Sequence, residues 1–227
     1  MAQPWQTIDK IDKEDNVLEL RKRGDRDFLL LVNGRVLMNS SANRSEVTLG
    51  EHACRLIAGR ELPQVLIGGL GMGFTLRAAL DALPALARVV VAELNPVIVT
   101  WCCGPLADLT QTAVKDPRVT VETNDVAAVI IDASLKDVKR FDAIIIDLYV
   151  GPGADTDPHY DPFYGSLALS TTANALSEGG IFAVWGENPD TAFERRLVAA
   201  GFTFERLRPG RGGLRHVVYV ARKQTVK

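Results

Sequence analysis

The stretch IGGLGMGFT, residues 67–75, holds four glycines in nine positions and leads directly into a helix-like run. Glycine costs conformational entropy and adds no packing, so a cluster of glycines marks a turn with positive φ or a close approach to the backbone. A plain tight turn, a phosphate cradle and a nucleoside-cofactor loop all fit this description. The sequence on either side of the stretch separates these possibilities.

Strand-like and helix-like segments alternate from residue 64 onward. The strand-like segments are near-continuous runs of Val, Ile and Leu, which are typical of strands buried on both faces. We expect strands at 64–69, 88–94, 118–123, 141–149 and 180–186, and helices at 75–83, from 96, from 125, near 163–178 and at 190–200. An antiparallel hairpin is expected over 202–222, at one sheet edge. The pattern predicts an α/β fold with a doubly wound, Rossmann-like sheet.

The first 60 residues follow a different pattern, in which short apolar stretches are broken by the pair Asn33-Gly34. Such a pair between apolar runs predicts a type I′ hairpin turn, because both residues tolerate positive φ. We expect a small antiparallel β unit with strands near 17–22, 27–32 and 35–39, then a helix from Ser45 to Ile57. The expected domains are this unit with its connecting helix, 1–60, and a Rossmann-like catalytic domain that binds the cofactor, 61–227.

The composition favours a small-molecule partner. The chain has 227 residues, 47% of them hydrophobic, with a net charge of −2 and no block of Lys and Arg, so neither a nucleic-acid nor a membrane surface is expected. No apolar run approaches the length of a membrane span and the start does not resemble a signal peptide, which predicts a cytoplasmic protein. The three cysteines and three scattered histidines lack metal-ligand spacing, so no metal site is expected.

A carboxylate follows the second strand of the predicted sheet. Glu93 stands about twenty residues beyond the glycines, where a carboxylate accepts hydrogen bonds from both ribose hydroxyls in nucleoside-binding folds. No Gly-Lys-Ser/Thr follows the glycines, which excludes Walker-type phosphate binding. NAD and an adenosyl cofactor both fit what remains.

Further acids follow the third and fourth strands. Asp125, within Asn124-Asp125-Val126, is placed to accept from an adenine amino group, although Asn124 or Asp125 can also simply cap the next helix. The fourth strand ends in Asp147-Leu148-Tyr149. Because the carboxyl ends of parallel strands meet at one edge of a sheet, these acids are expected to ring one nucleoside and one reaction centre.

On these residues the chain resembles the spermidine synthase family, within the class I fold of enzymes dependent on S-adenosylmethionine (SAM), from about Leu29 to Arg222. The family's GGGDGG-like loop with Thr-Leu-Arg, its Gly-Asp-Ala-like step and its D-x-x-D-P motif correspond to 69–77, 124–126 and 147–150, and Ser45-Glu46 with Glu51 match its D-E-x-x-Y-H-E region. The resemblance implies SAM or decarboxylated SAM, held by Gly69, Gly71, Met72, Gly73, Glu93, Leu94, Asn124, Asp125, Val126 and Asp147.

Two departures from the family pattern bear on the reaction. The resemblance implies an acid in the glycine loop that helps hold the amine of decarboxylated SAM, and this sequence has Met72 at that position. It also implies that the second acid of D-x-x-D helps hold a diamine, and this sequence has Val150 there. Apolar side chains forfeit charge-assisted hydrogen bonds of about 1.5–3 kcal/mol each. The main hypothesis is therefore methyl transfer to a small-molecule acceptor, with intact SAM as the preferred donor.

Two alternatives stay open: an aminopropyltransferase that uses decarboxylated SAM on an amine, and a catalytically silent protein that binds an adenosyl nucleoside. Asp147 and Tyr149 are the candidate catalytic residues, Asp147 to bind or deprotonate the acceptor. The Gly-, Pro- and Asp-rich segment 151–165 is interpreted as a lid or as solvated turns. Trp185 and Glu187 are candidate pocket walls, with core packing as the alternative for Trp185. We also expect a homodimer.

Overall fold

The structure is a computed structural model that describes residues 3–13, 16–135, 140–209 and 216–225. The chain divides into two compact units, Met1–Asn43 and Arg44–Lys227. The domain boundary expected after residue 60 stays a prediction.

The first unit is an antiparallel sheet of four strands in the order β1-β2-β3-β4. The turn between β3 and β4 has φ of 50° at Asn33 and 76° at Gly34, as the Asn-Gly pair predicts. Three strands lie where they are expected, whereas β1 was not predicted because its sequence QTIDKIDK offers only isolated apolar residues between charges. The strands are β1 (Gln6–Lys13), β2 (Asn16–Arg23), β3 (Asp27–Val32) and β4 (Arg35–Asn39).

The second unit is built on a seven-stranded sheet, counted over the described residues, in the order β10-β11-β9-β8-β5-β6-β7. The neighbours from β9 to β7 run parallel, while β11 pairs antiparallel with both β9 and β10. The predicted doubly wound sheet with an edge hairpin is therefore confirmed; the hairpin's Gly/Arg-rich turn lies outside the described residues. The strands are β5 (Gln64–Gly68), β6 (Arg88–Ala92), β7 (Val119–Glu122), β8 (Phe141–Ile146), β9 (Leu176–Gly186), β10 (Phe202–Leu207) and β11 (Val217–Lys223).

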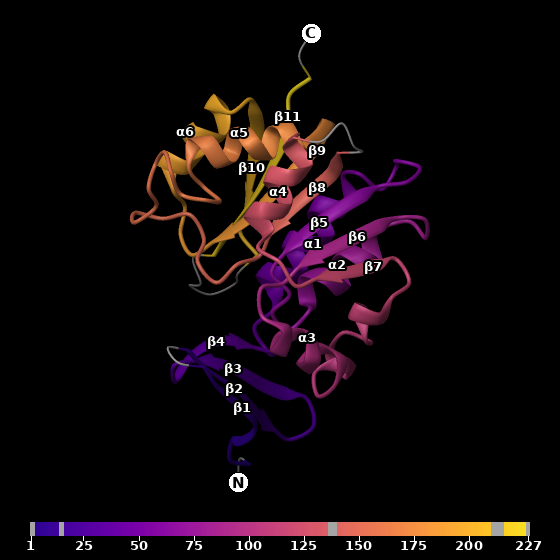
Figure 1. Cartoon of the computed structure of the whole chain (residues 1–227), viewed down its shortest axis with the longest axis vertical. Helices are drawn as coiled ribbons and strands as arrows, with labels where there is room; N and C mark the ends of the chain where they lie inside the picture. The colour runs from indigo at the N-terminus through magenta and orange to yellow at the C-terminus, as the bar shows by residue number, and fades with distance from the viewer. Residues whose placement is uncertain (1–2, 14–15, 136–139, 210–215, 226–227) are drawn as a thin grey trace. The chain divides into compact units, whose positions relative to one another are not determined.

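Helices cover both faces of this sheet (Figure 1). One layer contains α1 and α2, which pack against each other, and the other contains α4, α5 and α6, in which α5 contacts both of its neighbours. The elements are α1 (Arg44–Arg55), α2 (Phe74–Ala82), α3 (Pro96–Cys103), α4 (Val126–Leu135), α5 (Ser166–Ala175), α6 (Thr191–Ala199) and the short 3-10 turns η1 (Ala107–Leu109) and η2 (Ala113–Lys115).

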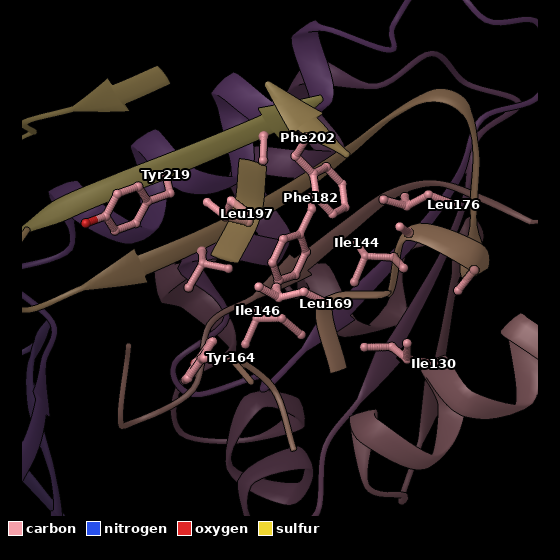
Figure 2. Close-up of a cluster of buried hydrophobic side chains, with 14 of the residues drawn as sticks. Ile130, Ile144, Ile146, Tyr164, Leu169, Leu176, Phe182, Leu197, Phe202 and Tyr219 are labelled. Carbon is pink, nitrogen blue, oxygen red and sulfur yellow. The ribbon is translucent and has the colours of Figure 1, made fainter. Parts of the chain in front are cut away.

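The main hydrophobic core lies between the sheet and the layer of α4, α5 and α6. Figure 2 shows Ile144 and Ile146 of β8 and Phe182 of β9 packed with Leu169 of α5 and Leu197 of α6. These side chains are almost completely buried, and burying each contributes about 1.5–3 kcal/mol. The core fixes β8 and β9, the strands whose carboxyl ends lead into the candidate site.

A polar clamp ties the amino ends of the central strands together. Asp142, a buried carboxylate near the start of β8, accepts hydrogen bonds from Arg60 at 2.5 Å and from the Ser177 hydroxyl at 2.8 Å. Its second oxygen accepts from the Gln64 N–H at 2.8 Å, at the start of β5. A buried charge is costly unless it is paired and hydrogen-bonded, and here it is both.

Candidate functional site

The glycine stretch forms the turn between β5 and α2. Gly69, Gly71 and Gly73 have φ of 89°, 51° and 83°, which is the left-handed region that favours glycine. The Gly73 N–H donates to the Leu70 carbonyl at 2.8 Å, and Gly73 is the residue that caps the start of α2. The positive φ expected from the glycine cluster is therefore present at all three positions.

Glu93 connects this turn to the end of the neighbouring strand β6. Its Oε2 accepts from the Leu70 N–H at 2.9 Å and its Oε1 accepts from the Asn95 N–H at 2.8 Å. The residue is 9% exposed, yet it forms part of the wall of the adjacent cleft. Each carboxylate oxygen retains a lone pair after its main-chain bond, so Glu93 can support the loop and still accept from a ligand hydroxyl.

A cleft of about 1040 Å³ lies over the carboxyl ends of β5, β6, β7, β8 and β9, where doubly wound sheets bind ligands. Seven of the residues predicted from the sequence line it: Gly69, Glu93, Leu94, Asn124, Asp125, Val126 and Tyr149. Trp185 and Glu187, the candidate walls, also line it. Gly71, Met72, Gly73 and Asp147 are not among its lining residues.

Met72 and its neighbours in the loop face protein. The Met72 side chain is completely buried. The Cys102 thiol of α3 lies 3.3 Å from the Gly71 carbonyl oxygen and donates to it, and burial raises the pKa of that thiol to about 12. The protonated thiol therefore helps to hold the turn, and Met72 is packed away from the cleft.

The charge of the cleft is one-sided. No Lys, Arg or His occurs among its described lining residues. Asp125, Asp161 and Asp190 accept main-chain N–H groups at the starts of turns or helices, whereas Asp155 and Glu187 are exposed acids on the cleft wall. The acidic lining residues are Glu93, Asp125, Asp155, Asp161, Glu187 and Asp190. Such a site attracts cations and repels anions.

The main chain after β8 is anchored from two sides. The Trp185 indole N–H donates to the Leu148 carbonyl at 2.8 Å, and the Tyr164 hydroxyl donates to the Val150 carbonyl at 2.9 Å. Burial raises the pKa of Tyr164, so its hydroxyl stays protonated as a donor. A Cβ on Gly151 would lie 2.6 Å from the Trp185 carbonyl oxygen, so only glycine permits this approach. The segment that presents the exposed side chains at the cleft is therefore held in place.

Asp147 lies beside the cleft with its carboxylate directed toward the helices α1 and α2. Its N–H donates to the Gly68 carbonyl at 2.8 Å, which extends the pairing of β8 with β5. Its Oδ2 accepts from the Thr75 hydroxyl at 2.5 Å. Burial, and then the negative charge of Glu46, raises the pKa of Asp147 to about 7, while the hydrogen bond from Thr75 lowers it. A carboxyl group with this pKa can take up or release a proton near neutral pH.

Thr75 and Glu46, two neighbours of Asp147, are not among the site residues predicted from the sequence. A signal for both exists in the sequence, because Thr75 opens the Thr-Leu-Arg step and Glu46 falls in the segment that matches the D-E-x-x-Y-H-E region. Spacing alone does not reveal that α1 brings Glu46 to the end of β8.

The described ranges contain neither a cluster of metal-ligating side chains nor a membrane-spanning helix. There, no group of three or more His, Cys, Asp or Glu side chains could hold a metal ion. In the same residues no helix has both the length and the apolar character needed to cross a bilayer.

Known proteins provide a sequence match over part of the chain. No protein-family model matches it. Polyamine aminopropyltransferases from two strains of Mycobacterium tuberculosis and from Mycobacterium bovis are 30% identical over 135 residues, which is 58% of this chain. The match spans only 24% of the length of those curated relatives.

Solved structures match nearly the whole chain. A spermidine synthase from Thermotoga maritima aligns with a TM-score of 0.73 at 18% identity, covering 96% of this chain and 73% of that one. A spermidine synthase in complex with the transition state analogue AdoDATO aligns with a TM-score of 0.72 at 18% identity, covering 96% of this chain and 72% of that one. This chain has a spermidine synthase-like fold.

The spermidine synthase-like fold confirms the resemblance found in the sequence and the expected fold class. The comparisons do not support methyl transfer, which was the main hypothesis; they favour the aminopropyltransferase alternative instead. The roles of the individual site residues and the homodimer stay predictions.

Proposed function

We propose that this chain transfers an aminopropyl group from decarboxylated SAM to an amine acceptor. The observation that carries the proposal is the cleft lined by carboxylates, with no basic side chain among its described lining residues. The partial match to polyamine aminopropyltransferases points in the same direction.

The charge of the cleft favours the decarboxylated donor over intact SAM. Both donors carry a sulfonium and an ammonium group, but only intact SAM adds a carboxylate. A carboxylate among these acids would meet repulsion that no basic side chain among the described lining residues offsets, and such unfavourable contacts generate specificity. The acids equally suit an amine acceptor, which is cationic in water.

The residues at the strand ends fit an adenosyl group. We assign Glu93 to the ribose hydroxyls and Asp125 to the adenine amino group, with Asn124, Val126 and the exposed Leu94 beside the base. Gly69 would bring the main chain close to the nucleoside. Carboxylate hydrogen bonds to hydroxyl or amino groups are charge-assisted and contribute about 1.5–3 kcal/mol each.

The transfer is a displacement at carbon. The acceptor nitrogen forms a bond to the aminopropyl carbon, the carbon–sulfur bond breaks with its electron pair going to sulfur, and the nitrogen loses one proton. We assign that proton to Asp147, whose pKa of about 7 suits a general base near neutral pH. Asp147 lies beside the cleft, and the exposed Tyr149, two residues further along the chain, would contact the acceptor there.

The test measures binding and turnover with defined donors. Calorimetry with decarboxylated SAM, intact SAM and NAD gives the donor preference, and mass spectrometry detects aminopropyl transfer to a panel of mono- and diamines. We expect decarboxylated SAM to bind most tightly and methylthioadenosine to form with at least one amine. Asp147→Asn should retain donor binding and lose turnover.

Each other outcome contradicts the proposal in a different way. Tighter binding of intact SAM with formation of S-adenosylhomocysteine would restore methyl transfer. Binding of an adenosyl donor without turnover on the whole panel would identify a silent nucleoside-binding protein. Binding of NAD alone would overturn the assignment of the adenosyl donor.

A further inference from the structure

Thr75 has a single hydroxyl proton and two acceptors within reach. Its side chain is buried at the start of α2 and 2% of the residue is exposed. Its Oγ1 lies 2.5 Å from Oδ2 of Asp147 and 3.3 Å from the main-chain carbonyl oxygen of Glu46. One O–H group cannot donate fully to both, so the shorter contact takes the proton whenever Asp147 is a carboxylate.

We propose that Thr75 is a positioning residue that holds Asp147 in both of its protonation states by turning its hydroxyl proton between the Asp147 carboxylate and the Glu46 carbonyl. When Asp147 is ionised, Thr75 donates to it. When Asp147 carries a proton, the carboxyl O–H donates to Thr75 Oγ1, and Thr75 in turn donates to the Glu46 carbonyl. The hydrogen bond between Asp147 and Thr75 is then kept in either state, and no side chain has to move.

The surroundings explain why Asp147 needs such a partner. The titratable groups that interact with Asp147 within the described residues are Glu46 of α1 and Tyr164, which precedes α5. Glu46 is held by the Ser45 hydroxyl, which donates to its Oε2 at 2.7 Å. Both burial and Glu46 disfavour the ionised form of Asp147, whereas the hydrogen bond from Thr75 favours it. Thr75 therefore keeps the proton exchange of Asp147 close to neutral pH.

The inference rests on the proposed function only in that the proton taken up by Asp147 comes from the amine acceptor. The hydrogen-bond exchange itself is a property of the protein without donor or acceptor. Its test can therefore fail or succeed whether or not aminopropyl transfer is observed.

The experiment follows the titration of Asp147 by carboxyl carbon NMR in the free, full-length protein, with the resonance assigned from Asp147→Asn. Thr75→Val keeps the shape of the side chain but removes the hydroxyl, and we expect the titration midpoint to rise by about one to two pH units. Thr75→Ser keeps the hydroxyl and should titrate close to the parent. Thr172→Val, at an equally buried threonine in α5, is the matched control and should leave the midpoint unchanged.

An unchanged midpoint in Thr75→Val would overturn the proposal, and so would a shift in Thr75→Ser as large as that in Thr75→Val. If Thr75→Val does not fold, Thr75→Ala removes the same hydroxyl with less bulk and must show the same rise. Where amine transfer is measurable, the pH profile of kcat should shift with the NMR midpoint while the KM for the donor stays the same.

Discussion

The carbonyl oxygen of Asp147 occupies the space that a Cβ on Gly69 would need. The two residues follow the adjacent parallel strands β8 and β5. From β5 the chain continues to β6 and β7 on one side of the sheet, and from β8 it continues to β9 on the other side. Gly69 also has a φ of 89°, so both the space and the backbone conformation require glycine. Gly69 thus permits close packing of the two strand ends at the point where it also lines the cleft.

Gly69→Ala should lower the free energy of unfolding by about 1–3 kcal/mol or more. The added methyl group would clash with the main-chain carbonyl of Asp147, and the left-handed conformation is strained for alanine. Urea unfolding measures the change. Gly59→Ala is the control, since a Cβ there meets no atom within 4 Å. Equal stability of the two variants would show that the strand ends separate easily.

Glu93→Ala should weaken the binding of the adenosyl donor at least about tenfold, because charge-assisted hydrogen bonds to the ribose are lost. The loop also loses the acceptor for the Leu70 N–H, which adds to the effect. Calorimetry gives the dissociation constant. The exposed Glu122, at the end of β7, provides the control Glu122→Ala, which should bind normally. A constant within about twofold of the parent for Glu93→Ala would exclude the ribose role.

Asp147→Asn should change how stability depends on pH. The pKa of Asp147 is raised to about 7 in the folded protein, against about 3.9 for an unfolded Asp, so the folded state holds the proton more tightly. The stability that this proton provides is complete below about pH 4 and is lost as the pH rises through about 7. The stability of the variant relative to the parent should therefore increase as the pH rises from about 4 to about 7. Thermal unfolding at several pH values tests this, and a difference independent of pH would contradict it.

Tyr164→Phe should loosen the main chain after β8, because the Val150 carbonyl loses its donor. The cost in stability should be about 0.5–1.5 kcal/mol, and the amide hydrogens around Val150 should exchange faster. Hydrogen exchange with mass spectrometry measures the effect. Tyr160→Phe is the control, because Tyr160 is 74% exposed. If exchange is unaffected in Tyr164→Phe, the indole of Trp185 alone holds the segment.

The sheet was predictable from the sequence because its central strands are buried on both faces and therefore consist of continuous apolar runs, as in β8. The glycine stretch was equally informative, since positive φ leaves few alternatives to glycine. The strand β1 was not predicted because its sequence contains only isolated apolar residues and no continuous apolar run.

The candidate site was predictable as a set of strand ends, which is why Glu93, Asp125 and Tyr149 were all found at the cleft. The direction of a side chain beyond a strand end was not predictable, because it depends on packing between distant segments. Met72 is buried and the Asp147 carboxylate turns toward Thr75 for this reason. The preference for intact SAM inferred from Met72 assumed a side chain that faces the donor.

The clamp around Asp142 has a consequence for the way such a protein can diversify. It joins the strands at the end of the sheet opposite to the cleft, through Arg60, Ser177 and the main chain of Gln64. None of these residues is among those that line the cleft. Substitutions at the exposed positions Ala154 and Asp155 are therefore expected to leave this clamp intact, so the charge of the cleft wall can change while the amino ends of the central strands stay tied together.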